Sequence, residues 1–233
     1  DRLASDFRLC GAEALARWHC TKYGDVSPGE FIPLMEQSGL IIPFGQWILS
    51  HSMAQCLEWS RSKPDFQISV NLSYIQLTQG DFISFLRTVL EENSLAPSRL
   101  IMELTETYLA KAEEDTLRLI AQMKELGVKI AMDDFGTGYS SLSCLSCTPA
   151  DIVKIDREFI RGICDQSHSF NRSFIGSVIN LCHSVGISVC AEGVEEKDEL
   201  ETVLRLKADS VQGFYFSKPV TPDEFEKQHI KHP

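Results

Sequence analysis

Short apolar runs with the two-residue spacing of β-strands alternate along the chain with longer runs that have helical spacing. The strands predicted from this pattern are 11–18, 68–73, 100–106, 128–134, 151–156, 187–193 and 208–216. The predicted helices are 27–37, 43–59, 81–92, 113–126, a short one after Ser140, 169–185 and 195–206. Regular alternation predicts a parallel α/β sheet, and seven strands in about 220 residues favour a (β/α) barrel over an open sheet.

The predicted strand count is one short of a closed barrel, which needs eight strands. We therefore expect one domain over residues 1–233, an eight-stranded (β/α) barrel of which one strand is missing from this chain. We expect that strand upstream of Asp1, unless residues 1–9 replace it imperfectly.

The stretch 128–142, VKIAMDDFGTGYSSL, organises the rest of the chain. A β-rich run ends in two adjacent carboxylates, Asp133 and Asp134, and enters a turn that contains Gly136 and Gly138. Asp residues also end strands and start turns through local backbone hydrogen bonds, so the pair alone indicates either a turn or a metal site.

Side-chain parity places a polar residue on the barrel-facing side of nearly every predicted strand. Because successive strand residues face opposite ways, the apolar set of each strand leaves one polar residue pointing inward. These residues are Asn71, Glu103, Asp133, Lys154, Glu192 and Gln212, and Glu13 shares its parity with Arg17. Unpaired buried charges cost several kcal/mol, so these groups must meet one another, water or metal.

Most of these polar residues lie toward the carboxyl end of their strand, where barrels of this kind build active sites. Carboxylate and amide oxygens suit Mg²⁺ or Mn²⁺ rather than zinc or copper, and a shared carboxylate would bridge two ions. Arg17 and Lys154 among the acids indicate an anionic oxygen substrate such as phosphate.

Composition excludes several functional classes. A formal net charge of -11 argues against general nucleic-acid binding, which needs a basic face. No apolar run reaches the length that spans a bilayer, and the first residues lack the apolar region of a signal peptide. Eight cysteines without a framework spacing fit a reducing cytoplasm, with Cys144 and Cys147 as core or surface thiols.

The chain closely resembles the EAL family, the bacterial cyclic di-GMP phosphodiesterase domains. Glu13-Ala14-Leu15 is the motif that names the family, and it continues into Arg17-Trp18. Further matches are FIPLMEQSGLI (31–41), SVNLS (69–73), ELTE (103–106), DDFGTGYSSL (133–142), VKID (153–156), AEGVE (191–195) and QGFYFSKP (212–219). The resemblance covers nearly the whole chain, with the motifs in the expected order.

The resemblance implies a modified TIM barrel that hydrolyses cyclic di-GMP to linear pGpG with two Mg²⁺ or Mn²⁺ ions. It implies one ion held by Glu13, Asn71, Glu103 and Asp133, and a second held by Asp133 and Asp134. By the same resemblance, Lys154 would orient the attacking water, and Glu192 would hold a water or act as a base. Leu15 and Arg17 would contact the dinucleotide, and Gln212 would lie near the nucleophile. Glu106 would tether the 134–142 loop.

The same resemblance implies a homodimer through the loop and helix after Asp134. One departure is that the family's first strand, with its Tyr-Gln-Pro stretch, is absent from the chain, as are sensory and diguanylate cyclase domains. Three functions stay open: an active phosphodiesterase, a catalytically silent cyclic di-GMP receptor, and another metal-dependent barrel enzyme such as a lyase.

Overall fold

The computed structural model describes residues 7–79, 81–138, 145, 148–165 and 169–231. Among these, the chain forms two compact units. Unit 1 comprises residues up to 102, residues 122–128 and residues from 220 onward, and unit 2 comprises residues 103–121 and 129–219. The single domain expected from the sequence stays a prediction.

Unit 1 is built on a parallel strand pair. Strand β1 (Gly11–Ala14) pairs with β4 (Gln67–Asn71), with Glu13 opposite Ser69. The chain between them forms the hairpin β2 (Trp18–Cys20) and β3 (Gly24–Val26), then α1 (Pro28–Ser38) and α2 (Ile41–Ser60). After β4 come α3 (Tyr74–Thr78), α4 (Phe82–Asn93), a 3-10 turn (Pro97–Arg99) and the start of β5 (Leu100–Thr105). The helix α11 (Pro222–Phe225) and a π-helical turn (Glu226–Ile230) also belong to unit 1.

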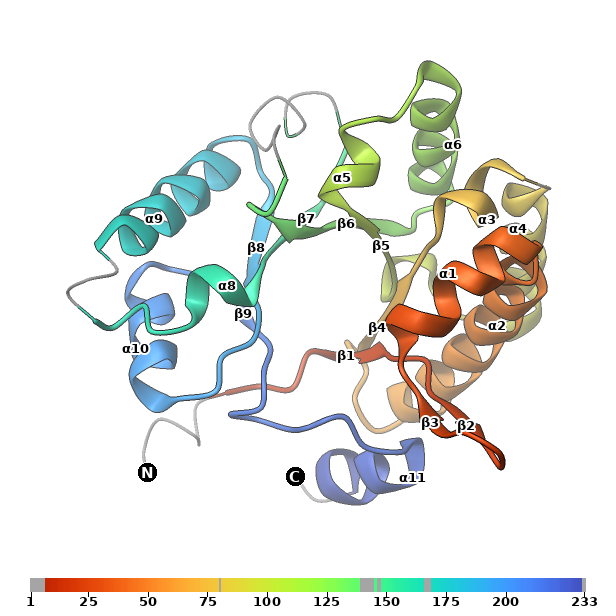
Figure 1. The fold of residues 1–233 in the computed structure, drawn as a ribbon, viewed down its shortest axis with the longest axis horizontal. Coiled ribbons are helices and arrows are strands. Elements are labelled where there is room, and N and C mark those ends of the chain that lie inside the picture. Colours follow the sequence, from red (N-terminus) through yellow and green to blue (C-terminus); the bar gives the residue numbers. More distant parts are fainter. Residues whose placement is uncertain (1–6, 80, 139–144, 146–147, 166–168, 232–233) are drawn as a thin grey trace. The chain divides into compact units, whose positions relative to one another are not determined.

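Helical periodicity explains how unit 1 buries its core. Gly39 ends α1 in the left-handed conformation, at φ 73°, and α2 then buries one face against β4. The largest fully buried side chains include Phe31, Leu49, Met53, Phe66, Leu77 and Leu86. Figure 1 shows α1 and α2 in red to orange beside β4. This packing places the ends of β1 and β4 side by side.

Unit 2 contains four parallel strands in chain order. These are β6 (Lys129–Phe135), β7 (Ile152–Ile155), β8 (Ser188–Ala191) and β9 (Ser210–Val211), and each pairs with the next. The last residues of β5 and the first turns of α6 (Glu114–Glu125) lie in the same unit. Its other helices are α5 (Glu106–Leu109), α8 (Arg157–Ile160), α9 (Ser169–Ser184) and α10 (Lys197–Arg205). Helix α9 packs against β8 (Figure 1).

Two aspartates fix the register of the strands of unit 2 near their amino ends. Asp151 accepts a hydrogen bond from the Ile130 N–H at 2.9 Å, just before β7 begins. Asp209, just before β9, accepts one from the Val189 N–H at 2.7 Å and also contacts His183 Nε2 at 2.9 Å. A slip of one residue would move every side chain of a strand to the other face of the sheet. These bonds therefore help to fix which side chains lie at the carboxyl ends of the strands.

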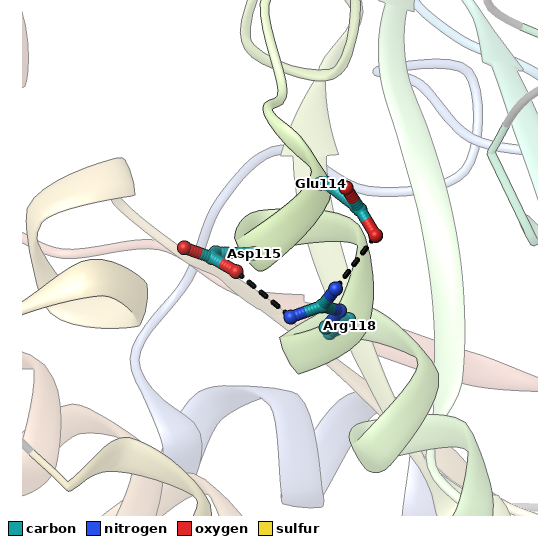
Figure 2. A network of polar contacts seen from close by, with 3 residues as sticks. All are labelled: Glu114, Asp115 and Arg118. Atoms are coloured by element: carbon teal, nitrogen blue, oxygen red, sulfur yellow. Dashed lines mark hydrogen bonds and ion pairs between the residues drawn. The ribbon is translucent and has the colours of Figure 1, made fainter.

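Charged side chains in the first turns of α6 are exposed to solvent. Arg118 donates to Glu114 at 2.6 Å and to Asp115 at 3.2 Å, one helical turn apart (Figure 2). All three side chains are more than half exposed, so these ion pairs contribute little to stability.

Several elements differ from the sequence prediction. The strand expected over 11–18 ends at Ala14, and Leu15 to Arg17 are not strand residues. The sequence pattern missed the β2–β3 hairpin and the short helices α3, α5 and α8, and β9 has two residues rather than nine. The helix expected after Ser140, the Cys144 to Cys147 pair and most of residues 1–9 lie outside the described residues.

Within the described part of the chain, no helix combines the length and the apolar character needed to cross a bilayer. Six cysteines of that part, Cys10, Cys20, Cys56, Cys164, Cys182 and Cys190, are free thiols.

Candidate active site

Lys154 is the centre of a cluster of carboxylates in unit 2. Its Nζ lies 2.8 Å from Glu103 Oε2, 2.7 Å from Glu192 Oε1 and 3.3 Å from Asp133 Oδ1. The side chains of Lys154 and Glu103 are 5% and 1% exposed, so water screens this pair weakly. Three carboxylates around one ammonium carry a formal net charge of -2, which favours a further cation at this place.

Each member of the cluster lies at or near the carboxyl end of its own strand. Glu103 lies on β5, Asp133 on β6 and Lys154 on β7, and Glu192 directly follows β8. The residues on both sides of Glu103 and Lys154, and those that precede Asp133 and Glu192, are apolar and buried: Met102, Leu104, Val153, Ile155, Met132 and Ala191. The alternation that identified these residues in the sequence is therefore the alternation of the strands themselves.

Asp133 and Asp134 form a β-bulge. Met132 pairs with Val153 and Phe135 pairs with Ile155, so the two aspartates together oppose Lys154. Asp134 has φ 55°, a left-handed conformation that Asp adopts more readily than most residues. A bulge redirects side chains, which allows two consecutive carboxylates to lie at one strand end instead of on opposite faces.

Glu106 fastens the turn that follows the bulge. Its Oε2 accepts hydrogen bonds from the Gly136 N–H at 2.9 Å and the Gly138 N–H at 3.3 Å. Gly136 has φ 104°, and a side chain there would come 2.5 Å from the Phe159 ring. The Glu106 carboxylate, which is fully buried, therefore holds the backbone at Gly136 and Gly138, and its tethering of the whole 134–142 loop stays a prediction.

In unit 1, the predicted ligands Glu13 and Asn71 are hydrogen-bonded to each other. Asn71 Nδ2 donates to Glu13 Oε1 at 2.8 Å. Glu13 lies on β1 and Asn71 is the last residue of β4, so the parallel pairing of the two strands brings the side chains together. Asn71 is exposed, in contrast to the buried inward position that parity predicted for it.

Leu15 and Arg17 are both exposed beyond the end of β1. The parity relation between Glu13 and Arg17 is wrong, because the strand ends before Arg17. Arg17 donates to the Ala16 carbonyl at 2.8 Å and lines a cavity of about 320 Å³ with Trp18, Asp25, Val26, Ser27 and Pro28. Trp18 packs edge-on against Phe31, with ring centroids 5.8 Å apart, and stays 43% exposed.

Gln212 joins the end of β9 to the segment after Glu192. Its N–H donates to the Ala191 carbonyl at 2.9 Å, and its carbonyl accepts from the Val194 N–H at 3.1 Å. The half-buried Gln212 is thereby held beside the end of β8, which Glu192 directly follows.

Sequence reasoning missed Cys190, which pairs with Lys154 in the sheet register. Burial, and next the charge of Glu192, raise the pKa of the Cys190 thiol to about 12. The thiol is protonated at neutral pH and supplies neither a thiolate ligand nor a nucleophile. Strand alternation places Cys190 on the same face as Glu192. The sequence did not mark it as a site residue, because a buried cysteine behaves as a small apolar side chain and does not interrupt an apolar run.

The residues of the cluster fit a hard divalent cation by their chemistry. All the negatively charged groups are carboxylates, the oxygen donors that Mg²⁺ and Mn²⁺ prefer. In the structure the shared cation is the Lys154 ammonium, and no group of three or more His, Cys, Asp or Glu side chains in the described ranges has the geometry of a metal site.

The arrangement defines the class of parallel α/β-barrel proteins with an acidic, lysine-containing site at the strand ends. The chain belongs to the EAL domain family, whose model matches residues 4–219. The solved structure of the MucR phosphodiesterase in complex with c-di-GMP superimposes with a TM-score of 0.85 at 36% identity, over 93% of this chain and 87% of that one. The fold class predicted from the sequence, a modified TIM barrel, is confirmed.

Two proteins named as cyclic di-GMP phosphodiesterases are also similar to this chain in sequence. MucR of Pseudomonas aeruginosa, a bifunctional diguanylate cyclase/cyclic di-GMP phosphodiesterase, is 36% identical over 95% of this chain and 32% of its own length. PdeR of Escherichia coli, a cyclic di-GMP phosphodiesterase, is 34% identical over 94% of this chain and 33% of its own. The chain thus spans about a third of the length of these relatives.

Proposed function

We propose that this chain is a metal-dependent phosphodiesterase domain that hydrolyses cyclic di-GMP to linear pGpG. The observation that carries the proposal is the buried Lys154 cluster, in which three carboxylates from different strand ends meet one ammonium. The names of MucR and PdeR support the same substrate and reaction.

In this proposal Glu13, Asn71, Glu103 and Asp133 hold one Mg²⁺ or Mn²⁺ ion, and Asp133 and Asp134 hold a second. Ions held by these residues would supply a more acidic water and would neutralise charge on the phosphate in the transition state. The bulge at Asp133 and Asp134 supports this assignment, since it lets consecutive carboxylates serve the same place. The Glu13–Asn71 hydrogen bond supports it as well, because it orders both side chains before any ligand binds.

The remaining residues act on water and substrate. Lys154 orients the attacking water, and its contact with Glu192 keeps that carboxylate in place to accept the water's proton. Arg17 and Leu15 contact the dinucleotide, where the exposed Arg17 guanidinium suits a phosphate, and Gln212 lies near the nucleophile. The proposed location is the cytoplasm, which the free thiols of the described part fit. The proposed homodimer would form through the loop and helix after Asp134.

The first test is turnover of cyclic di-GMP with Mn²⁺, with Mg²⁺ and in a chelator. We expect pGpG to form with either ion and turnover to stop in the chelator, and Ca²⁺ to inhibit because its looser coordination misplaces the carboxylates. Binding measured by calorimetry without any turnover would identify a receptor instead, and full activity in the chelator would refute the metal assignment.

Glu106→Ala is expected to reduce turnover by about tenfold or more without releasing metal, because the side chain holds the loop and contacts no ion in the proposal. Turnover and Mn²⁺ content are measured on the same sample. Glu106→Gln is the matched control, since one amide oxygen can still accept the N–H groups of Gly136 and Gly138. A fall in Mn²⁺ content in step with turnover would make Glu106 a ligand.

A further inference from the structure

Glu199 is a buried carboxylate of unit 2 that does not belong to the cluster around Lys154. Glu199 is 4% exposed and lies in the first turn of α10. Its Oε2 accepts hydrogen bonds from the N–H groups of Glu195 at 3.0 Å and Glu196 at 3.1 Å, which is ordinary capping of a helix start. Its Oε1 accepts a third bond, from the Gly162 N–H at 3.0 Å. Capping does not account for that third bond, because Gly162 lies far from α10 in sequence.

The two segments joined by Glu199 lead directly to Lys154 and Glu192. Gly162 lies in the turn that directly follows α8, and α8 starts just after β7, the strand that carries Lys154. Glu195 and Glu196 follow Glu192 by only a few residues. The segments also touch at Gly193, where an added Cβ would come 2.3 Å from Arg157 Cβ.

We propose that Glu199 is a positioning residue that sets the 2.7 Å contact between Lys154 and Glu192. The inference rests on the proposed function, in which that pair handles the attacking water. One carboxylate oxygen holds the segment after β7 and the other holds the segment after β8. A carboxylate is needed because both of its oxygens accept hydrogen bonds, and such supporting groups commonly change activity when they are lost.

Glu199→Gln separates the two roles of this side chain. A glutamine has one acceptor oxygen, so it keeps either the cap of α10 or the link to Gly162, and its amide NH₂ would face a backbone N–H at the other. The chain offers a matched control in Glu224, which occupies the same position in the capping box of α11. Glu224 is exposed, and among the residues that the structure describes its side-chain oxygens accept hydrogen bonds only from Thr221, at the start of its own helix.

The experiment compares Glu199→Gln and Glu224→Gln with the wild type at a temperature where all three are folded. We expect kcat for cyclic di-GMP to fall by about tenfold or more in Glu199→Gln with KM within about twofold, because water positioning acts in the transition state. Glu224→Gln should keep both constants. Hydrogen exchange followed by mass spectrometry, without substrate, should become faster in Glu199→Gln at residues 157–162 and 193–196.

Exchange in the absence of substrate separates this inference from the proposed function. Faster exchange in both segments of Glu199→Gln would support the proposal that Glu199 holds them together. If the wild type also leaves cyclic di-GMP intact, the proposed phosphodiesterase function would be refuted while this link stands. Unchanged exchange and unchanged kcat in Glu199→Gln would overturn the inference. So would a loss of kcat that only follows the loss of folded protein, since Glu199 would then be a helix cap and nothing more.

Discussion

Lys154→Met is expected to lower the free energy of unfolding of the metal-free protein by about 3–5 kcal/mol, the usual cost of removing one partner from a buried ion pair. The substitution keeps the length and apolar stem of the side chain but removes the cation that Glu103, Asp133 and Glu192 share. Saturating Mn²⁺ should restore much of this stability, because an ion that binds only the folded state stabilises it. The measurement is urea unfolding with chelator and with Mn²⁺.

Turnover should fall in Lys154→Met more than affinity for cyclic di-GMP, since a group that orients water acts mainly in the transition state. Lys129→Met is the control, because Lys129 begins β6 and makes no ion pair with any residue that the structure describes. If Lys154→Met unfolds at the wild-type urea concentration in chelator, Lys154 does not balance the charge of the carboxylates. Equal losses of turnover and affinity would assign Lys154 to substrate binding.

Sequence parity located the cluster around Lys154 because Glu103 and Lys154 are each the single charged residue in an otherwise mostly apolar strand. Glu103 lies between Met102 and Leu104, and Lys154 lies between Val153 and Ile155, all of which are buried. Burial makes such an interruption costly, so the side chains must meet partners, and parallel strands bring their carboxyl ends to one edge. Strand alternation and the cost of desolvation are enough to bring these side chains together.

The bulge at Asp133 and Asp134 could not be predicted in the same way. Strict alternation places only one of the two aspartates on the inner face, whereas the extra residue in β6 lets both oppose Lys154. The left-handed backbone of Asp134 is compatible with the sequence but is not required by it.

Short elements escaped prediction because they contain too few residues to establish a period. The hairpin strands β2 and β3 have three residues each, and α5 and α8 have four. These elements matter for the site: α5 begins with Glu106, and α8 leads to Gly162. Glu199 was hidden for another reason, since an acid in the first turn of an amphipathic helix is normally exposed to solvent.

Asp133→Asn is expected to reduce hydrolysis of cyclic di-GMP by about 10³-fold or more, a loss of about 4 kcal/mol in transition-state stabilisation. Asp133 is the carboxylate that the proposal shares between both ions, so its neutral isostere weakens both sites at once. The stability of the metal-free protein should be unchanged or higher, because one of three like charges around Lys154 is removed. Turnover, Mn²⁺ content and thermal unfolding are measured together.

Asp151→Asn is the matched control for this prediction, because it makes the same chemical change near the amino end of the neighbouring strand. The asparagine oxygen can still accept the hydrogen bond from the Ile130 N–H, so turnover should stay within about threefold of wild type, as for a tolerated substitution. Asp133→Asn protein that keeps wild-type turnover and binds its full complement of Mn²⁺ would remove Asp133 from the metal site. Asp133→Asn protein that loses turnover only because it unfolds would instead make Asp133 a structural partner of Lys154.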